Sequence, residues 1–397
     1  MTPGANDVLR ANQDFIVRSA DAAATTLWHP TQGTEVTIGR TAASILGFFA
    51  LPRTVEEVLR RLTTDAAERS SLSRVIVGLR EAGLLVPVAS PEHVPPGATG
   101  LFGAPFATIA AALRTSHFDA IAVGVEYDAG ASQKAGSRSA PDAIRRASGS
   151  LFTRADGRGM YDPVRGRRVL ENVRLADIGN LSDTVQTRNG DMFERLEEFA
   201  SACADRQTVS VAIGGDHSIT FGLVSGHLRR RRRLGILHID AHSDYLEPMH
   251  GDWRTSLHHG NVMSWLAGRG EIATIAQFGI RQLAEEDPVP GDKVMVWPGT
   301  SALRLDSGRV EESLDRSMPW YLSIDVDVLD PAFLPSTGTP LPGGLTPAEL
   351  TQLIDLVCRG REIVGIDLVE LIPNESDHSA LLASEVLLRA LDAVFRR

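Results

Sequence analysis

Cysteine is scarce in this chain, and long apolar runs are missing from it. The 397 residues include only two cysteines, Cys203 and Cys358, so thiolates can build neither a disulfide framework nor a zinc ribbon or iron–sulfur cluster. No run of 18 apolar residues occurs, and the N-terminus lacks the basic and apolar segments of a signal peptide. We therefore expect a cytoplasmic protein that is neither exported nor membrane-spanning.

An excess of positive charge is also missing. Forty Lys and Arg residues stand against fifty Asp and Glu residues, which gives a net charge of −10. This balance argues against general binding to nucleic acid or to anionic membranes. The run of five arginines from Arg229 to Arg233 is interpreted as the end of a helix, where cations interact favourably with the helix dipole. With 43% hydrophobic and 23% charged residues, the composition is that of a folded globular protein.

A change in composition divides the chain near residue 98. Residues 90–106 are rich in Pro and Gly and have no apolar periodicity, which indicates a linker. Before them, Thr54 and Glu57 have the spacing of a capping box, strands are expected in DFIVRS and TEVTIG, and a later helix should end at Gly83. We predict a small α+β domain at 1–97, a linker at 98–117 and a catalytic domain at 118–397.

After the linker, short apolar runs alternate with helical stretches. This rhythm predicts a three-layer α/β/α domain with a mainly parallel sheet. In such sheets, ligands bind beyond the carboxyl ends of the strands. The expected strands lie in DAIAVGVEY, TVSVAIGG, LGILHID, ATIAQFGIR, KVMVWP, PWYLSIDVD and REIVGIDLVE.

Three of these strand ends carry acidic and imidazole side chains. Alternate residues of an extended segment point to the same side, so four carboxylates and two imidazoles should converge at one edge of the sheet. Carboxylates this close could not all ionise without cations. Two divalent ions suit six ligands better than one tetrahedral zinc, and an oxygen-rich set without thiolate favours Mn²⁺, with nickel and cobalt left open. The residues are His217, Asp240, His242, Asp244, Asp325 and Asp327.

The motifs around these residues resemble a known family. GGDHS at 214–218, DAHSD at 240–244 and SIDVDVLDP at 323–331 are similar to the three signature motifs of the ureohydrolases, the arginase and agmatinase family. PSTGTPLPGGLT, GIDLVELIP and GVEYDAGASQKAGSRSAPDAIR continue the match, which covers about residues 118–397. The resemblance implies an arginase-like fold, a homo-oligomer, and hydrolysis of a guanidino group to urea and an amine.

The resemblance also assigns the metal ligands. It implies two Mn²⁺ ions that are bridged by Asp240 and Asp325 and that lower the pKa of a shared water for attack on the guanidinium carbon. His217 and Asp244 complete the first site, and His242 and Asp327 complete the second.

In this family a histidine gives a proton to the leaving amine. LHHG offers His258 and His259; HGNVMSWL aligns best when His259 is the donor, and His258 remains the alternative. Glu370 matches the carboxylate that binds the guanidinium. The resemblance thus implies His259, Glu370 and Asp244 as catalytic residues, with Glu370 and His259 also binding the substrate.

Two further polar residues have supporting interpretations. Asp216 is expected to orient His217 or the adjacent loop. His238 is interpreted as a core histidine with satisfied hydrogen bonds, although alternation points it the same way as Asp240. Both cysteines are expected to be buried small hydrophobes.

The sequence departs from the family pattern where enzymes acting on free arginine anchor its α-groups. Leu246 replaces a polar residue, and Gln282, Leu283 and Ala284 replace acids. A buried α-group without a partner would cost about 1–3 kcal/mol. Free arginine is therefore disfavoured, and agmatine, guanidinobutyrate or a guanidino group on a larger molecule remain.

The N-terminal domain weakly resembles the small winged-helix-like domains that recognise leader peptides in ribosomal peptide modification. Such a domain would bring a precursor peptide to the catalytic domain, where arginine side chains would become ornithine. The alternative is a lid or oligomerisation domain in a small-molecule hydrolase such as an agmatinase or guanidinobutyrase. A single-zinc deacetylase of related fold is disfavoured by the second ligand set at His242 and Asp327, and an inactive binding protein by the complete set of ligands.

Overall fold

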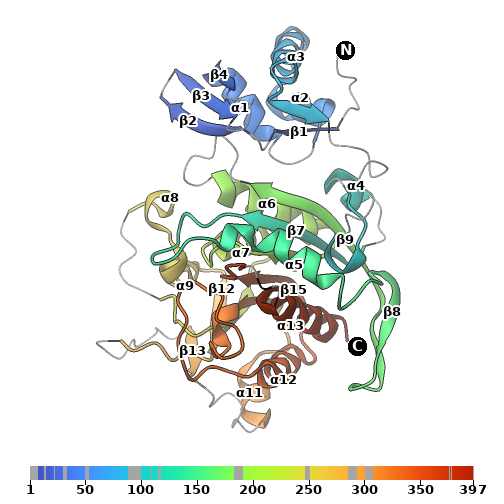
Figure 1. Cartoon of the computed structure of the whole chain (residues 1–397), viewed down its shortest axis with the longest axis vertical. Coiled ribbons are helices and arrows are strands. Elements are labelled where there is room, and N and C mark those ends of the chain that lie inside the picture. The colour runs from blue at the N-terminus through green and yellow to red at the C-terminus, as the bar shows by residue number, and fades with distance from the viewer. Residues whose placement is uncertain are drawn as a thin grey trace. The chain divides into compact units, whose positions relative to one another are not determined.

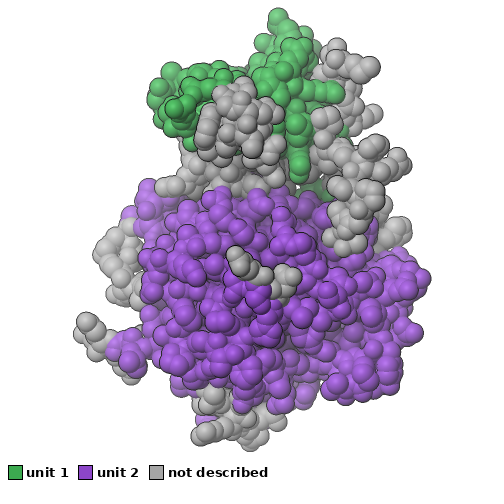
Figure 2. Space-filling model, in the orientation of Figure 1, with its two compact units in different colours: residues 1–98, 107–114, 181–191 green, residues 99–106, 115–180, 192–397 purple. Residues whose placement is uncertain are grey.

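The chain forms two compact units. The first comprises residues 1–98, 107–114 and 181–191, and the second comprises residues 99–106, 115–180 and 192–397 (Figure 2). The computed structural model describes residues 8–12, 15–21, 23–29, 34–49, 53–87, 100–107, 109–114, 118–182, 191–245, 251–284, 293–299, 307–374, 376 and 378–396.

The first unit contains two small antiparallel sheets and short helices. One sheet has the order β5-β1-β6 and the other the order β2-β3-β4. Leu9, Leu27, Ile45 and Ile76 are buried in its core. The elements are β1 (Val8–Ala11), β2 (Ile16–Ala20), β3 (Ala24–His29), β4 (Thr34–Gly39), α1 (Arg40–Phe48), β5 (Arg53–Thr54), α2 (Val55–Leu62), α3 (Ala66–Glu81), β6 (Leu85–Pro87) and α4 (Ile109–Arg114).

The start of α2 and the end of α3 agree with the sequence signals. Thr54 Oγ1 accepts from the backbone N–H of Glu57 at 3.1 Å, and Glu57 Oε2 accepts from the backbone N–H of Thr54 at 2.8 Å. This capping box begins α2. Helix α3 ends two residues before Gly83, whose φ of +73° is a conformation that glycine adopts without strain.

The second unit is built on a nine-stranded sheet in the order β13-β12-β11-β14-β15-β10-β7-β9-β8. The seven strands from β13 to β7 run parallel to their neighbours, and they are the seven that the sequence predicts. The strands are β7 (Ala120–Glu126), β8 (Asp156–Asp162), β9 (Arg167–Ser182), β10 (Val209–Ile213), β11 (Leu234–Ile239), β12 (Ile272–Phe278), β13 (Val294–Trp297), β14 (Trp320–Asp325) and β15 (Ile363–Val369).

Helices flank this sheet, which confirms the predicted three-layer α/β/α fold (Figure 1). Helices α5, α12 and α13 share one apolar core with the strands. Helix α7 packs near β15 and α9 near β12, and Phe193 of α6 contacts Phe221 of α7. The helices are α5 (Ala140–Ser148), α6 (Asp191–Asp205), α7 (Ile219–Leu228), α8 (Trp253–Ser256), α9 (Val262–Ala267), α11 (Ser307–Ser313), α12 (Pro347–Cys358) and α13 (His378–Phe395), with 3₁₀ turns η2 (Leu101–Gly103), η3 (Ser137–Ser139), η4 (His259–Asn261) and η5 (Val326–Val328).

The β8–β9 hairpin is an addition that the sequence analysis did not foresee. Strand β9 contains Leu170 and Asn172 with φ of +49° and +64°, which interrupts the alternation on which strand prediction depends. Within the segment predicted as a linker, Leu101 and Phe102 are fully buried in the core of the second unit.

Among the described residues, no helix has the length and apolar character needed to cross a membrane.

Candidate metal centre and catalytic site

The proposed site lies where four neighbouring strands of the parallel sheet end. Strands β11, β14, β15 and β10 are adjacent in that order. After β10, Gly214 and Gly215 have φ of +77° and +86°, a conformation that glycine adopts without strain. A Cβ on Gly214 would also lie 2.7 Å from Pro141. This glycine turn carries Asp216 and His217 across the sheet edge towards the ends of β11 and β14.

The expectation that the two acidic motifs remain extended is wrong. Strand β14 ends at Asp325, whose Oδ1 accepts from the backbone N–H of Asp327 at 2.8 Å, so that Asp327 lies in the 3₁₀ turn η5. Strand β11 ends before Asp240, and Asp244 has a φ of +48°. The side chains still converge, but bends after the strands bring them together.

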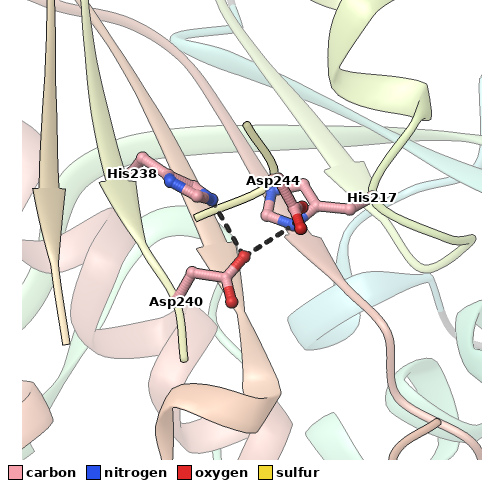
Figure 3. Close-up of side chains that lie close together, drawn as sticks. All are labelled: His217, His238, Asp240 and Asp244. Carbon is pink, nitrogen blue, oxygen red and sulfur yellow. Dashed lines mark hydrogen bonds and ion pairs between the residues drawn. The ribbon is translucent and has the colours of Figure 1, made fainter. Parts of the chain in front are cut away.

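The first group of converging side chains surrounds His217 (Figure 3). Its Nδ1 lies 3.0 Å from Asp240 Oδ2, 3.0 Å from Asp244 Oδ2 and 3.3 Å from Asp325 Oδ2. All four residues are buried. This Nδ1 is a buried atom without a hydrogen-bond partner. An unpartnered nitrogen facing three carboxylates fits a site for a cation.

The second group surrounds His242. Its Nδ1 lies 2.9 Å from Asp327 Oδ2 and 3.5 Å from Asp240 Oδ1. Asp240 thus presents one carboxylate oxygen to each group, which is the arrangement expected of a bridging ligand. Asp325 differs, because its Oδ2 faces His217 while its Oδ1 accepts a backbone N–H. Two sets of side chains have ligand atoms that all lie within 4.8 Å of one another, a proximity compatible with metal binding: His217, His238, Asp240 and Asp244, and Asp240, His242 and Asp327.

The pKa shifts in these two groups reflect repulsion between buried carboxylates that lie close together. Burial and the neighbouring Asp327 and Asp240 carboxylates raise the pKa of Asp325 well above its usual value. Burial and Asp240 raise the pKa of Asp327 to about 6. Burial alone would lower the pKa of His242, but its bonds to Asp240 and Asp327 raise it to about 11. Divalent cations would relieve the same repulsion that these shifts express.

His238 lies beside the first group but both of its ring nitrogens are engaged. Gln277 Nε2 donates to Ser243 O at 2.6 Å and lies 2.9 Å from His238 Nδ1. With Nδ1 as the acceptor, His238 Nε2 carries the hydrogen and donates to Asp240 Oδ2 at 2.9 Å. His238 is therefore a buried histidine with satisfied hydrogen bonds that also supports Asp240.

Glu370 and His259 lie together next to the first group. Glu370 follows β15 with a φ of +66°, and its Oε1 accepts from the backbone N–H of His217 at 2.8 Å and lies 3.1 Å from His259 Nδ1. His258 instead uses its Nδ1 to accept from the backbone N–H of Gly260, capping the turn η4. The geometry thus brings His259, and not His258, against Glu370.

Asp216 supports a loop and not the ring of His217. Its Oδ2 accepts from the backbone N–H of Gly130 at 2.7 Å, and its Oδ1 accepts from that of Ser218 at 3.0 Å. Burial and the nearby Glu370 raise the pKa of Asp216 to about 7. Of the two roles expected for Asp216, the structure shows the one towards the adjacent loop.

A buried chain of hydrogen bonds behind His217 was missed by the sequence analysis. His217 Nε2 lies 2.8 Å from Ser323 Oγ, and Ser323 Oγ donates to Asp367 Oδ1 at 2.6 Å. Thr220 and Tyr321 donate to Asp367 Oδ2 at 2.8 and 2.9 Å. A charged residue within the apolar strand GIDLVE was the available signal, since a buried carboxylate needs several donors. The chain fixes the ring of His217 with Nδ1 towards the acids.

The residues that depart from the arginine-anchoring pattern are exposed where described. Gln282, Leu283 and Ala284 are exposed, and Leu283 retains 96% of its surface. Leu246 lies outside the described residues. The described part of this segment therefore offers no acid to a substrate's α-ammonium group.

Comparison with known proteins identifies a family that most of the chain matches. The model of a family described as the arginase family matches residues 118–392. Human mitochondrial guanidino acid hydrolase is 30% identical over 77% of this chain and 86% of its own length. An agmatinase of Neisseria meningitidis is 32% identical over 70% of this chain and 87% of its own length.

Solved structures agree with this placement. A hypothetical agmatinase from Burkholderia thailandensis superposes with a TM-score of 0.63 and 25% identity, covering 75% of this chain and 90% of that chain. Proclavaminate amidino hydrolase from Streptomyces clavuligerus superposes with a TM-score of 0.60 and 29% identity, covering 70% and 92%.

Proposed function

The chain belongs to the arginase family, hydrolases that act on guanidino C–N bonds, and we propose that it is a dinuclear manganese ureohydrolase that converts arginine side chains of a precursor peptide to ornithine. The observation that carries the metal part is the unpartnered His217 Nδ1 facing three carboxylates. The substrate part rests on Gln282, Leu283 and Ala284, which stand where the family pattern has acids, and on the N-terminal unit.

The two groups of ligands would each hold one ion. When bound, such a pair lowers the pKa of a water molecule so that a nucleophile forms near neutral pH. The oxygen-rich donor set supports Mn²⁺, and nickel or cobalt would use the same donors. His217, Asp240, Asp244 and Asp325 would hold the first ion, and Asp240, His242, Asp325 and Asp327 the second.

Glu370 would bind and orient the guanidinium. A planar guanidinium offers paired N–H donors that a carboxylate accepts in a bidentate manner. The carboxylate is buried, and its Oε1 is fixed by the backbone N–H of His217. The reacting carbon would therefore be held beside the metal ligands by a group that cannot turn away.

His259 would protonate the leaving nitrogen. Burial opposes the charged imidazole, but the bond to Glu370 and the charges of Glu370, Asp244 and Asp216 outweigh it and raise the pKa of His259. These neighbours therefore favour the protonated ring, the form that can give a proton. As the bond between the guanidinium carbon and the substrate nitrogen breaks, that nitrogen takes the proton and leaves as a neutral amine.

A peptide substrate agrees with the exposed Gln282, Leu283 and Ala284, because the α-groups of peptidyl arginine are neutral amides that need no charged partner. The alternative is a small-molecule hydrolase such as an agmatinase or guanidinobutyrase. Its support is that the names of similar proteins include agmatinase and guanidino acid hydrolase.

The N-terminal unit would supply the leader-binding site, residues 1–97 acting as a recognition domain. Strand β2 lies at the edge of its sheet and, among the described residues, pairs only with β3. An extended peptide could add to such an edge as a further strand. A linked docking site raises local substrate concentration to about the millimolar range. Buried free thiols at Cys203 and Cys358 agree with the proposed cytoplasmic location, and a homo-oligomer remains part of the proposal.

The test is a urea-release assay on the Mn²⁺-loaded protein. Candidate substrates are agmatine, guanidinobutyrate, free arginine, an arginine-containing precursor peptide encoded near the gene, and the same peptide without its leader. The proposal expects the full peptide to exceed the leaderless one in kcat/KM by about 10² or more. Fast turnover of agmatine or guanidinobutyrate, with equal rates for the two peptides, would establish the alternative.

A further inference from the structure

Ser132 makes two contacts with one nitrogen of His259. Its backbone N–H donates to His259 Nε2 at 3.0 Å, and its Oγ lies 2.8 Å from the same nitrogen. At the other side of the ring, Nδ1 lies 3.1 Å from Glu370 Oε1. The imidazole is therefore held at both nitrogens, by residues that come from different parts of the chain.

The loop that carries Ser132 is fixed in place. The backbone N–H of Gly130 donates to Asp216 at 2.7 Å, and Gly130 O accepts from the backbone N–H of His259 at 3.4 Å. Gly136 N–H donates to Asp128 Oδ2 at 2.8 Å and closes the loop on itself. A Cβ on Gly130 would lie 3.0 Å from Asp216 Oδ2, so the loop approaches the site as closely as glycine allows. Ser132 is thus tied to the buried part of the site although it is itself exposed.

The two contacts suit two different protonation states of the ring. In the neutral ring with hydrogen on Nδ1, the lone pair of Nε2 accepts the backbone N–H of Ser132, and Nδ1–H donates to Glu370. In the imidazolium, Nε2 also carries hydrogen and needs an acceptor, which a backbone N–H cannot be. The hydroxyl oxygen of Ser132, 2.8 Å away, is an acceptor.

We propose that Ser132 is a positioning residue that provides a hydrogen-bond partner for Nε2 of His259 in both protonation states of the ring. This inference rests on the proposed function, in which His259 protonates the leaving amine. The backbone N–H serves the neutral ring that remains after proton transfer. The hydroxyl serves the cation that precedes it. The hydrogen on Nδ1 stays with Glu370 in both states, so the proton that passes to the leaving nitrogen is the one on Nε2, and the ring keeps one orientation.

The effect of removing the hydroxyl follows from the groups that face the ring. Glu370 after β15, Asp244 after β11 and Asp216 after β10 favour the cation, and His258 is its neighbour on the same turn. Ser132→Ala leaves all of these and the backbone donor in place, and removes only the acceptor of the cation. The pKa of His259 should then fall by about one unit, the value of one hydrogen bond to a charged group.

The experiment compares pH profiles of kcat for the full-length, Mn²⁺-loaded wild-type and Ser132→Ala proteins. The substrate is whichever guanidino compound the wild type hydrolyses. The limb on which activity falls at high pH should move down by about one pH unit in Ser132→Ala, while KM changes less than twofold. Ser132→Thr keeps a hydroxyl and should restore the wild-type profile. Ser139→Ala makes the same change at an exposed position without a side-chain cap bond and should have no effect.

A double variant shows whether Ser132 acts through His259. Adding Ser132→Ala to His259→Asn should cause no further loss, because the two effects share one ring. Any of three results would overturn the inference: an unshifted pH profile in Ser132→Ala, a Ser132→Thr variant that behaves like Ser132→Ala, or additive losses in the double variant. If the wild type still released urea, the proposed function would stand. Absence of urea release by the Mn²⁺-loaded wild type would instead overturn the proposed function, and this inference with it.

Discussion

Asp240 belongs to both groups of proposed metal ligands. Its Oδ2 faces His217 at 3.0 Å and its Oδ1 faces His242 at 3.5 Å, while His238 donates to Oδ2 from behind. Burial alone would raise the pKa of Asp240, but His238 and the adjacent imidazoles of His217 and His242 hold it well below its usual value. The carboxylate is therefore ionised and oriented before any cation arrives.

Asp240→Asn should weaken both metal sites together and abolish urea release, because the amide removes the negative charge that the two sites share. Metal content after dialysis, measured by elemental analysis, and urea release check this outcome. Asp205→Asn, at an exposed carboxylate that pairs with Arg230, serves as the control and should keep both properties. A variant at Asp240 that kept two ions and full turnover would refute the bridging assignment.

His259→Asn should lower kcat by about 10² to 10⁴, the range for a lost acid–base group, with metal content unchanged. His258→Asn is the matched control, because His258 caps the turn η4 whereas His259 is the histidine that lies 3.1 Å from Glu370, and it should cost far less activity. Steady-state kinetics of both variants decide between the adjacent histidines. The reverse order of losses would make His258 the donor.

His227 gives a pH dependence of stability that is separate from the site. Burial and the nearby Arg231 lower its pKa to about 3, and its Nε2 lies 2.8 Å from Ser210 Oγ. The pKa of this histidine is lower in the folded state than in the unfolded state, where it is about 6.5, so this residue contributes its full stability to the fold above pH 6.5. That contribution is lost as the pH falls from 6.5 towards 3, by about 1.4 kcal/mol per pH unit.

His227→Gln removes this titration and keeps a polar group for Ser210. Its unfolding free energy should therefore fall less steeply than that of the wild type between pH 6 and pH 4, and in parallel with it above pH 7. Denaturant unfolding at several pH values measures both slopes. Parallel slopes throughout the acid range would mean that His227 is not held neutral.

At the scale of elements, the sequence predicts the strands of the parallel sheet and their functional ends. Apolar runs and the rule that ligands bind at carboxyl ends suffice to place His217, Asp240 and Asp325 at one edge. The bends after β11 and β14 could not be predicted, because they depend on the φ of +48° at Asp244 and on the 3₁₀ turn at Asp327. Ser132 gave no signal at all, since nothing in a loop sequence indicates which distant side chain it will contact.

At the level of secondary-structure elements, the buried salt bridge between α5 and β9 provides the clearest test of stability. Asp177 on β9 accepts from Arg145 Nε at 2.7 Å and from Arg145 Nη2 at 2.8 Å, and both side chains are almost fully buried. Asp177 also accepts from the backbone N–H groups of Leu101 and Gly179. One carboxylate thus joins a helix, a strand and the turn η2.

Asp177→Asn should lower the unfolding free energy by about 3–5 kcal/mol, because it removes the buried carboxylate that contacts Arg145 most closely and leaves only the exposed Asp142 at 3.5 Å as an ion-pair partner. Denaturant unfolding measures this loss, and Asp205→Asn should lose no more than about 1 kcal/mol, as expected for an exposed pair. Equal stabilities of the two variants would show that the buried pair contributes no more than an exposed one.

At the scale of the whole molecule, all of the proposed metal ligands, His259 and Glu370 belong to the second unit, which is also where the match to the arginase family lies. The first unit has a separate hydrophobic core. The proposal assigns chemistry to the second unit and substrate selection to the first. The central claim, a guanidino hydrolase with a metal pair, can therefore be tested independently of the peptide.

The most direct test counts metal ions and urea on the same full-length sample. Protein stripped with a chelator should release no urea from any guanidino substrate. Titration with Mn²⁺ should restore activity as the content approaches two ions per chain, since two groups of possible ligands share Asp240. Saturation at a single tightly bound zinc ion, or a loaded protein that releases no urea from peptide, agmatine, guanidinobutyrate or arginine, would contradict the account.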